Sequence, residues 1–239
     1  MAEESVLVET TIAAPIERVW RALRDPALIR LWFGWDSESL IEEIDFIFAK
    51  SGMEGVPGRR LDFGEWEGAA DSFVLTEAGA GTTLTVLRTG KAITPAAYDE
   101  VVEGWISFVA QLRLMLEQHA DPRRTLYLSG NARPNAGALS DALGLAQLSD
   151  APLGMGYTAN LAPGESVSGK IWHRSTFQIG LTVRQWGDGL LIVANRPIAE
   201  SRPAGGGYLI LSTYGLGDAE FADLEKRWRD WWSQSFLTR

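Results

Sequence analysis

Few side chains in this chain of 239 residues could do metal or nucleophile chemistry, because it contains two histidines and no cysteine. Without cysteine there is no thiol nucleophile, no disulfide and no thiolate ligand. Two histidines do not supply the multi-histidine sets of common metal sites, and paired spacings such as HxxxH are absent. We therefore expect no metal ion and no cofactor.

The serine, glycine and acidic residues form no catalytic motif that we recognise. Serine stands next to glycine in "SGN" and "VSGK", but neither matches the GxSxG turn of a nucleophilic serine. The glycine clusters "GVPGRR" and "PAGGGY" lack the spacing of a phosphate-binding loop. Glu42-Glu43 and Asp99-Glu100 are chain neighbours, so on a helix their side chains point about 100° apart and cannot share a proton. We interpret both pairs as solvated and predict no catalytic residue.

His173 is the histidine whose surroundings suggest a role. Strand alternation over residues 169–186 would place it on one face with apolar side chains such as Ile171 and Ile179. A buried neutral imidazole is the simplest interpretation, and a general base or a ligand contact is the alternative. No acidic residue close in sequence supports a catalytic relay. His119 ends a long predicted helix, where the helix dipole favours a cation, and we interpret it as structural.

Aromatic rings are the best candidates for binding. The stretch "LWFGWD" places Trp32, Phe33 and Trp35 around one glycine, just after a short apolar segment. The ten tryptophans of the chain could simply fill core, since each large ring buries about 150 to 250 Å². The alternative is an apolar pocket with few polar groups. For that pocket we predict these ligand-binding residues: Trp32, Trp35, Tyr98, Trp105, Phe108 and His173.

The first half of the sequence contains elements that would position these rings. Pro15 and Pro95 stand at plausible first positions of helices, and Thr94 is a plausible N-cap. Residues 38–50 favour a helix, although a strand is compatible with so short an apolar run. The other predicted elements are a strand at 5–12, helices at 15–24 and 27–34, strands at 59–66, 71–78 and 82–89, and a long amphipathic helix at 94–118.

The second half repeats this order of elements in weaker form. A short polar break at 119–124 separates the halves, and five of the ten tryptophans lie on each side. We infer a diverged duplication with a period of about 120 residues, and two unrelated α+β halves are the alternative. The predicted elements are a strand at 124–130, a helix at 135–148, strands at 169–186, 189–197 and 207–215, and a helix at 218–236 with Asp218 as N-cap.

Charge is distributed unevenly along the chain. Residues 1–119 contain 10 basic and 20 acidic side chains, and residues 120–239 contain 12 and 11. An acidic half repels phosphate backbones and anionic lipid, so we expect binding to neither nucleic acid nor membranes. No apolar run approaches the roughly 18 residues of a membrane span, and the start "MAEESVLVETT" lacks the features of a secretory signal. These features favour a cytoplasmic protein.

The segment "VETTIAAPIERVWRALRDPALIRLWFGWD" (residues 8–36) resembles the opening of the START-like, or SRPBCC, superfamily. The similarity is greatest to the group of the C-terminal domain of the Hsp90 ATPase activator, in which a strand, a proline-started helix, a "DP" break and "W-F-G" follow in this order. Residues 98–117 are similar to the terminal helix of that group. The resemblance extends over residues 5–118. It implies a helix-grip fold, in which an antiparallel sheet curls around a long last helix and can leave an apolar cavity.

The resemblance implies an α+β chain with two helix-grip domains. The first is a START-like domain at 1–120, and the second, at 121–239, is a diverged copy that matches only in element order. Only three clear strands follow residues 38–50, fewer than is usual in the family. Fewer strands would make a smaller or partly plugged cavity.

Three functions follow as hypotheses. The first is a non-enzymatic protein that binds a small apolar or aromatic molecule between sheet and long helix. The second is an enzyme of the cyclase, aromatase or hydrolase kind, with His173 as acid or base, which requires a charged or hydroxyl partner beside that residue. The third is a protein-interaction or co-chaperone-like module similar to the Hsp90 ATPase activator, which requires an exposed apolar patch.

Overall fold

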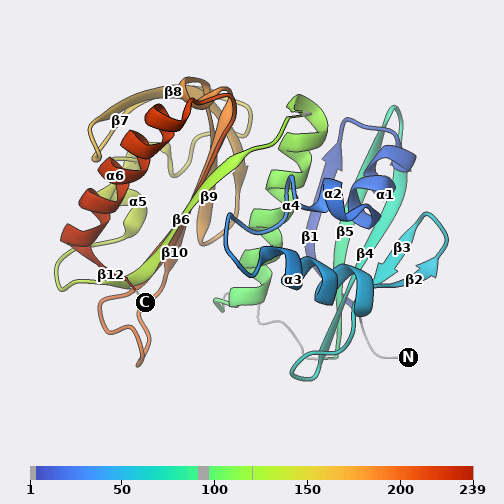
Figure 1. Cartoon of the computed structure of the whole chain (residues 1–239). Helices are drawn as coiled ribbons and strands as arrows, with labels where there is room; N and C mark the ends of the chain where they lie inside the picture. Colours follow the sequence, from blue (N-terminus) through green and yellow to red (C-terminus); the bar gives the residue numbers. More distant parts are fainter. Residues whose placement is uncertain (1–3, 91–96, 120, 239) are drawn as a thin grey trace. The chain divides into compact units, whose positions relative to one another are not determined.

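The computed structural model describes residues 4–90, 97–119 and 121–238. The chain divides into two compact units, Met1–Asp121 and Pro122–Arg239 (Figure 1), which we call unit 1 and unit 2. Each unit has an antiparallel sheet, helices and a hydrophobic core of its own.

Unit 1 is built on a five-stranded antiparallel sheet. Its strands are β1 (Glu4–Ile12), β2 (Met53–Val56), β3 (Arg60–Asp62), β4 (Ala69–Ala78) and β5 (Gly81–Gly90). Their order in the sheet is β1-β5-β4-β3-β2. The β4–β5 hairpin turns at Gly79, whose positive φ of 62° suits a residue without a Cβ. The pairing of β1 with β5 brings the first strand beside the last.

Helical segments flank this sheet. They are α1 (Ile16–Arg24), α2 (Pro26–Ile29), α3 (Leu40–Ile44), the π-helical turn η1 (Asp45–Lys50) and α4 (Glu100–Gln118). Asp25 separates α1 from α2, and its carboxylate accepts a hydrogen bond from the backbone N–H of Ala27 at 2.9 Å. Residues 40–50 are helical, as their apolar spacing favoured.

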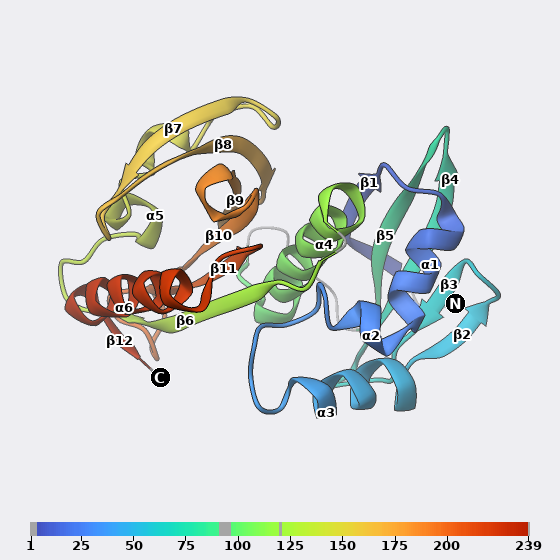
Figure 2. The same cartoon turned by 45° about the horizontal axis from the view of Figure 1, so that its top comes forward.

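The long helix α4 packs on the sheet of unit 1, and Figure 2 shows it beside β1. Trp105, Val109 and Leu116 of this helix belong to one buried hydrophobic cluster. Phe73 of β4 and Leu84 of β5 belong to the same cluster, so helix and sheet share a core. The apolar stripe of the sequence therefore forms this interface.

Unit 2 has a seven-stranded antiparallel sheet. Its strands are β6 (Arg124–Ala132), β7 (Gly156–Leu161), β8 (Glu165–Arg174), β9 (Gln178–Val183), β10 (Gly189–Arg196), β11 (Gly206–Thr213) and β12 (Phe236–Thr238). Its helical segments are α5 (Leu139–Ala142), the short 3₁₀ turns η2 (Ala146–Leu148) and η3 (Arg184–Trp186), and α6 (Asp218–Ser235). Trp228 and Trp232 of α6 share a buried cluster with Leu126 of β6 and Leu209 of β11.

The two sheets follow one pattern of strand order. Unit 2 runs β6-β11-β10-β9-β8-β7, with β12 added outside β6. In both units the first strand pairs with the last strand before the long helix, and the others follow in reverse chain order. Each unit is thus an antiparallel sheet packed against a long C-terminal helix. The predicted fold class, α+β with helix-grip architecture, is confirmed.

The start of α4 differs from the prediction. Its first helical residue is Glu100, and the side chain of Asp99 caps the helix. Because a capping side chain satisfies N–H groups that have no partner within the helix, it sets where the helix begins. Thr94 and Pro95, the predicted N-cap and first position, lie outside the described residues.

Four further features of the chain differ from the prediction. Residues 169–186 form two strands rather than one, because the chain turns at Ser175, whose Oγ accepts hydrogen bonds from the backbone N–H groups of Phe177 and Gln178 at 3.2 and 3.1 Å. The helix predicted at 135–148 is reduced to α5 and η2. The strands β2 and β7 were not predicted. Asp218 is the first residue of α6 and not its cap.

Candidate functional site

A cleft of about 600 Å³ opens in unit 1 beside the start of α4. Three segments form its walls, namely the π-helical turn η1, the connection between β3 and β4, and residues 98–101 with Trp105. Three strand residues, Ala69 and Asp71 of β4 and Arg88 of β5, also line it. The cleft is therefore bounded by the N-terminal end of α4 and by the sheet that packs on this helix.

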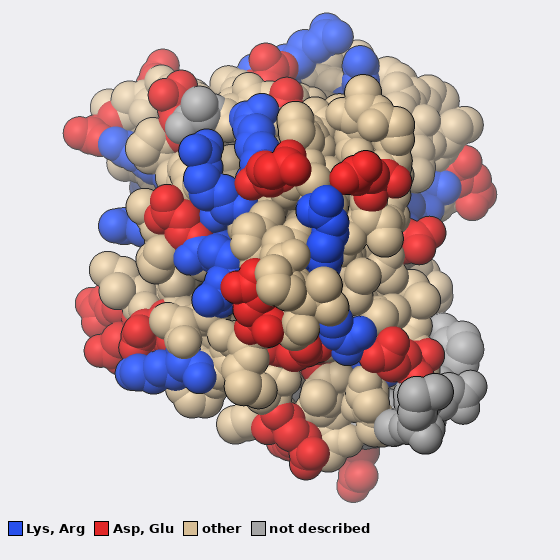
Figure 3. All heavy atoms as spheres, turned by 90° about the vertical axis from the view of Figure 1, so that its right-hand side faces the viewer, with Lys and Arg blue, Asp and Glu red and all other residues tan. Residues whose placement is uncertain are grey.

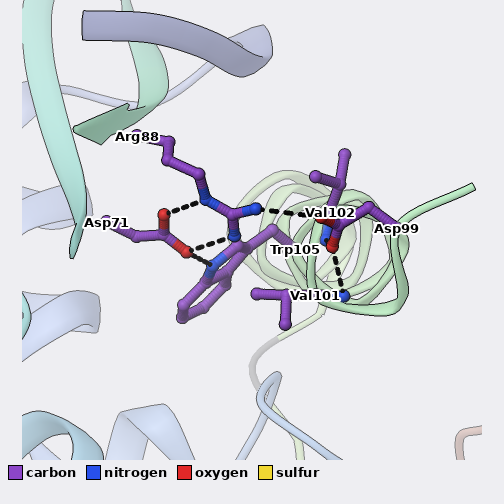
Figure 4. Close-up of polar contacts among 6 residues, drawn as sticks. All are labelled: Asp71, Arg88, Asp99, Val101, Val102 and Trp105. Atoms are coloured by element: carbon purple, nitrogen blue, oxygen red, sulfur yellow. Dashed lines mark hydrogen bonds and ion pairs between the residues drawn. The ribbon is translucent and has the colours of Figure 1, made fainter. Parts of the chain in front are cut away.

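The floor of the cleft is a buried ion pair (Figure 4). Nε of Arg88 donates to Oδ1 of Asp71 at 2.8 Å, and one terminal nitrogen donates to Oδ2 at 3.0 Å. The two side chains are only 4% and 9% exposed. Asp71 and Arg88 stand directly opposite each other in the β4–β5 register, so the hairpin itself brings them together.

Two further contacts connect this pair to α4. The indole Nε1–H of Trp105 donates to Oδ2 of Asp71 at 2.7 Å. The second terminal nitrogen of Arg88 donates to Oδ2 of Asp99 at 3.1 Å. Oδ1 of Asp99 meanwhile accepts from the backbone N–H groups of Val101 and Val102 at 2.9 and 3.1 Å. Asp99 thus caps the helix and binds the arginine at once, and our interpretation of it as a solvated acid is wrong.

The electrostatics keep Arg88 charged. Its hydrogen bond with Asp71 raises the pKa of the guanidinium above its ordinary value, against the opposing effect of burial. A buried charge without a partner is very costly, so this geometry requires both carboxylates. The carboxylate of Asp71 accepts three hydrogen bonds. We infer that this network is a fixed polar floor and not an acid–base pair.

Ion pairs at the surface of unit 1 are of a different kind. Figure 3 shows acidic and basic side chains interspersed on one face of the molecule. The pair Arg59–Glu77, at 3.1 Å, has side chains that are 41% and 71% exposed. Exposed pairs of this type contribute about 0 to 1 kcal/mol. The ion pair at the cleft floor differs from these surface pairs because it is buried.

Aromatic side chains form the apolar part of the cleft wall. The ring of Phe63 stacks on Trp105, with centroids 5.4 Å apart and planes at 25°. Trp66 stands at the rim, 67% exposed. It precedes a tight turn in which Glu67 and Gly68 both have positive φ, 50° and 81°, and paired backbone hydrogen bonds between Trp66 and Ala69 close this turn. Such a two-residue turn fixes the point of the backbone from which the exposed ring projects.

The structure brings together two of the six predicted ligand-binding residues, Tyr98 and Trp105, which both line the cleft. Trp32 is fully buried in the core, where its indole donates to the carbonyl of Ala22 at 3.0 Å. Trp35 is half-buried, with its ring 6.3 Å from that of Phe108. Trp32, Trp35 and Phe108 do not line the cleft.

His173 lies in unit 2, on β8. Its Nε2 is 3.0 Å from Oε1 of Gln178, whose amide nitrogen is 3.4 Å from the hydroxyl of Tyr208. An amide does not exchange a proton as an acid or base would. The imidazole also lies against Gly180, where an added Cβ would come within 2.1 Å of Nδ1. The contacts with glycine and amide fit a packed half-buried imidazole.

Sequence reasoning missed Asp71, Arg88, Asp99, Phe63 and Trp66 at this site. A signal for the ion pair was present in the hairpin. If the two-residue turn of the β4–β5 hairpin is placed at Gly79 and Ala80, simple counting puts residue 71 opposite residue 88. The prediction named both strands but did not extend the register to their charged residues.

Two findings concern other kinds of site. Within the residues that the structure describes, no group of three or more histidine, aspartate or glutamate side chains is arranged to hold a metal ion. In the same part of the chain, every helix is too short or too polar to cross a bilayer.

Comparison with known proteins gives distant structural likenesses. No protein-family model matches the chain, and no curated protein matches it. Among solved structures, DynU16, from the dynemicin biosynthetic locus, is 18% identical, covers 98% of this chain and 96% of its own, and gives a TM-score of 0.36. CalU16 from Micromonospora echinospora is 23% identical over 48% of this chain and 66% of its own, with a TM-score of 0.35.

An AHSA1-like protein from Rhizobium etli is 24% identical over 49% of this chain and 84% of its own, again with a TM-score of 0.35. Likenesses as distant as these assign no function to the chain. A function for the chain must be inferred from the geometry of the cleft.

Proposed function

We propose that unit 1 binds a small apolar or aromatic molecule in the cleft beside α4. The observation that carries this proposal is the cleft itself, about 600 Å³ in volume, with aromatic walls and a fully paired polar floor. Small-molecule sites are commonly about 300 to 1,000 Å³ and mostly apolar, with a few fixed polar groups.

The pairing of the floor favours an apolar ligand. Asp71 and Arg88 are occupied by each other, and in addition Trp105 donates a hydrogen bond to Asp71 and Asp99 accepts one from Arg88. What the cleft offers a ligand is mainly ring surface. Each 100 Å² of apolar ligand surface removed from water contributes roughly 2.5 kcal/mol.

We also propose that the chain is a tandem of START-like domains, 1–120 and 121–239, with the second copy diverged. The shared order of strands and the long helix at the end of each unit support this proposal. The proposed binding function concerns unit 1, where the cleft lies.

A matched pair of substitutions on β4 tests the binding function. Ala69 lines the cleft, whereas its neighbour Ala70 is not part of the lining and, by strand alternation, faces the other side of the sheet. We expect 2-naphthalenemethanol, a neutral probe, to bind the full chain and to shift the NMR signal of the Trp105 indole N–H. Ala69→Leu should weaken binding at least tenfold because its side chain fills the cleft, and Ala70→Leu should leave the affinity unchanged.

Two results would contradict the proposal. One is the absence of binding by this probe and by a panel of similar apolar molecules. The other is binding that Ala69→Leu does not weaken, which would place the ligand elsewhere. Native mass spectrometry of the protein from its own host complements this test, since a bound small molecule would add a defined mass.

A protein partner is the second candidate function. Phe46, Trp66 and Val101 line the cleft and are 55%, 67% and 47% exposed. Exposed apolar side chains that lie together often mark interaction sites. Trp66→Ala would weaken the binding of a partner protein, and Ala69→Leu would affect that binding little, because the partner would contact the rim of the cleft and not its interior. Affinity purification with both variants distinguishes this candidate from small-molecule binding.

A further inference from the structure

We propose that the cleft of unit 1 selects a cationic ligand, one that joins an aromatic or apolar body to a protonated amine or quaternary ammonium group. This inference rests on the proposed binding function and specifies the class of ligand. It comes from the charges on the cleft lining and from where those charges stand relative to the rings.

The lining is strongly acidic. Among the residues that the structure describes, five carboxylates line the cleft, those of Glu65, Glu67, Asp71, Asp99 and Glu100, against one basic side chain. That basic group is the guanidinium of Arg88, which is held between two of the carboxylates. An anionic ligand would therefore meet like charges, and a cation would meet opposite ones.

The carboxylates at the rim stand beside an exposed ring. Glu65 and Glu67 flank Trp66, and all three side chains are exposed and line the cleft. The paired hydrogen bonds between Trp66 and Ala69, at 2.7 and 3.0 Å, keep this turn closed. An aromatic face is attractive to an ammonium group, and indole is the best of the natural rings for this contact. Ring and acids together favour the same kind of ligand.

One feature of the cleft acts in the opposite direction. The N-terminal end of a helix attracts anions, and the first turn of α4 lines the cleft. Asp99 already accepts hydrogen bonds from the N–H groups of Val101 and Val102, and Glu100 places a second carboxylate in that turn. The protein's own acids thus satisfy the helix end, and little attraction for an external anion remains.

Three matched probes test this inference on the full chain. They are 2-naphthylmethylammonium, 2-naphthalenemethanol and 2-naphthoate, which share a ring system and differ in charge. We expect the cation to bind about tenfold more tightly than the neutral alcohol at 20 mM salt, and the anion to bind most weakly. The ratio should shrink at 300 mM salt, because salt screens exposed charges. Isothermal titration calorimetry and tryptophan fluorescence give the dissociation constants.

A charge-removing double variant locates the effect. Glu65→Gln with Glu67→Gln should lower the affinity for the cation far more than the affinity for the neutral alcohol, and so remove most of the preference. The control is Glu17→Gln with Glu38→Gln, which removes two exposed carboxylates of unit 1 that do not line the cleft. This control should keep the preference.

The outcomes separate this inference from the proposed function. If cation and alcohol bind equally well, the inference is wrong and binding in the cleft stands. If the control variant removes the preference as fully as the rim variant, the effect comes from net charge and the inference is again wrong. If none of the probes binds, the proposed function fails and the inference fails with it.

Discussion

Both units place a tryptophan of the long helix against a buried carboxylate that also binds an arginine. In unit 1 the carboxylate is Asp71, which accepts from Trp105 and Arg88. In unit 2 it is Glu165, which accepts from the indole of Trp228 at 3.1 Å and from a terminal nitrogen of Arg227 at 2.7 Å. The same three chemical groups thus join helix to sheet twice in this chain.

The origin of the arginine differs between the units. Arg88 comes from the sheet and is 4% exposed, whereas Arg227 comes from the helix itself and is 38% exposed. In unit 1 the network lines an open cleft of about 600 Å³. A hollow of about 110 Å³ in unit 2 lies at the β8–β9 turn and is not lined by α6. In unit 1, where the sheet contributes the arginine, the interface between helix and sheet is open. In unit 2, bulky rings fill the interface between helix and sheet.

Removing the carboxylate should lower the free energy of unfolding more in unit 1 than in unit 2. We expect Asp71→Asn to lower the free energy of unfolding by about 3 kcal/mol, because it leaves a buried guanidinium short of a partner. Glu165→Gln should cost only about 1 kcal/mol, since Arg227 is partly exposed and also pairs with Asp223. Urea unfolding followed by tryptophan fluorescence and circular dichroism measures both changes.

The control for this comparison is Asp62→Asn. Asp62 binds Arg60 at 2.6 Å, but the two side chains are 30% and 28% exposed. We expect a cost below about 1 kcal/mol for a pair that water reaches. If Asp71→Asn cost no more than Asp62→Asn, burial would not be what makes the cleft floor important.

Alkaline pH should destabilise unit 2 through Tyr157. This side chain belongs to the buried core of unit 2, where burial raises the pKa of its phenol above the ordinary value of 10.0. Above pH 10 the unfolded chain releases the phenol proton while the folded chain keeps it, so stability falls as the pH rises. Linkage gives a loss of about 1.4 kcal/mol by pH 11.

The variant Tyr157→Phe tests this linkage. It loses the hydrogen bond from the phenol to the carbonyl of Thr182, at 2.9 Å, which lowers stability at every pH. The informative quantity is therefore the slope of stability between pH 9 and 11, which the variant should reduce; Tyr214, whose pKa burial also raises, keeps part of that slope. An unchanged slope in Tyr157→Phe would show that other groups control alkaline unfolding.

The sequence predicted the elements that carry strong apolar periodicity. The stripe of α4 and the strands β4 and β5 were found because their buried faces repeat at the helical or strand period. The strand β2 was missed, since its four residues are exposed and show no alternation in burial. The pattern of residues 169–186 predicts one strand, because the turn at Ser175 uses a side-chain hydroxyl rather than glycine or proline.

The residues of the candidate site likewise divide into those that local sequence predicts and those that it does not. Trp105 and Tyr98 were predicted because the sequence pattern puts both on the apolar stripe of one helix, although in the structure Tyr98 precedes the first residue of α4, Glu100. Asp71 and Arg88 were not, since their importance comes from a partner on another strand and not from local sequence. Asp99 was missed because its neighbour Glu100 made the two look like a solvated acidic pair. Contacts across elements, rather than patterns along them, define this cleft.

The helix caps give the last and smallest contrast. Asp99 caps α4 through its carboxylate, whereas α6 is capped by Gly217, whose φ of −66° and ψ of 164° are open to any residue. Serine there would place an acceptor before Glu220, whose carboxylate already accepts from the backbone N–H of Gly217 at 2.8 Å.

We therefore expect Gly217→Ser to raise the stability of unit 2 by about 0.3 to 0.5 kcal/mol through a complete capping box. An added Cβ would lie 3.3 Å from Oε2 of Glu220, which is the end of a flexible side chain and can shift by a few tenths of an ångström. Thermal unfolding of Gly217→Ser beside Gly215→Ser, a change outside the helix at a positive φ of 68°, measures the gain. A loss of stability in Gly217→Ser would mean that Glu220 cannot yield, and that the bond it makes to the backbone already caps the helix as well as a serine would.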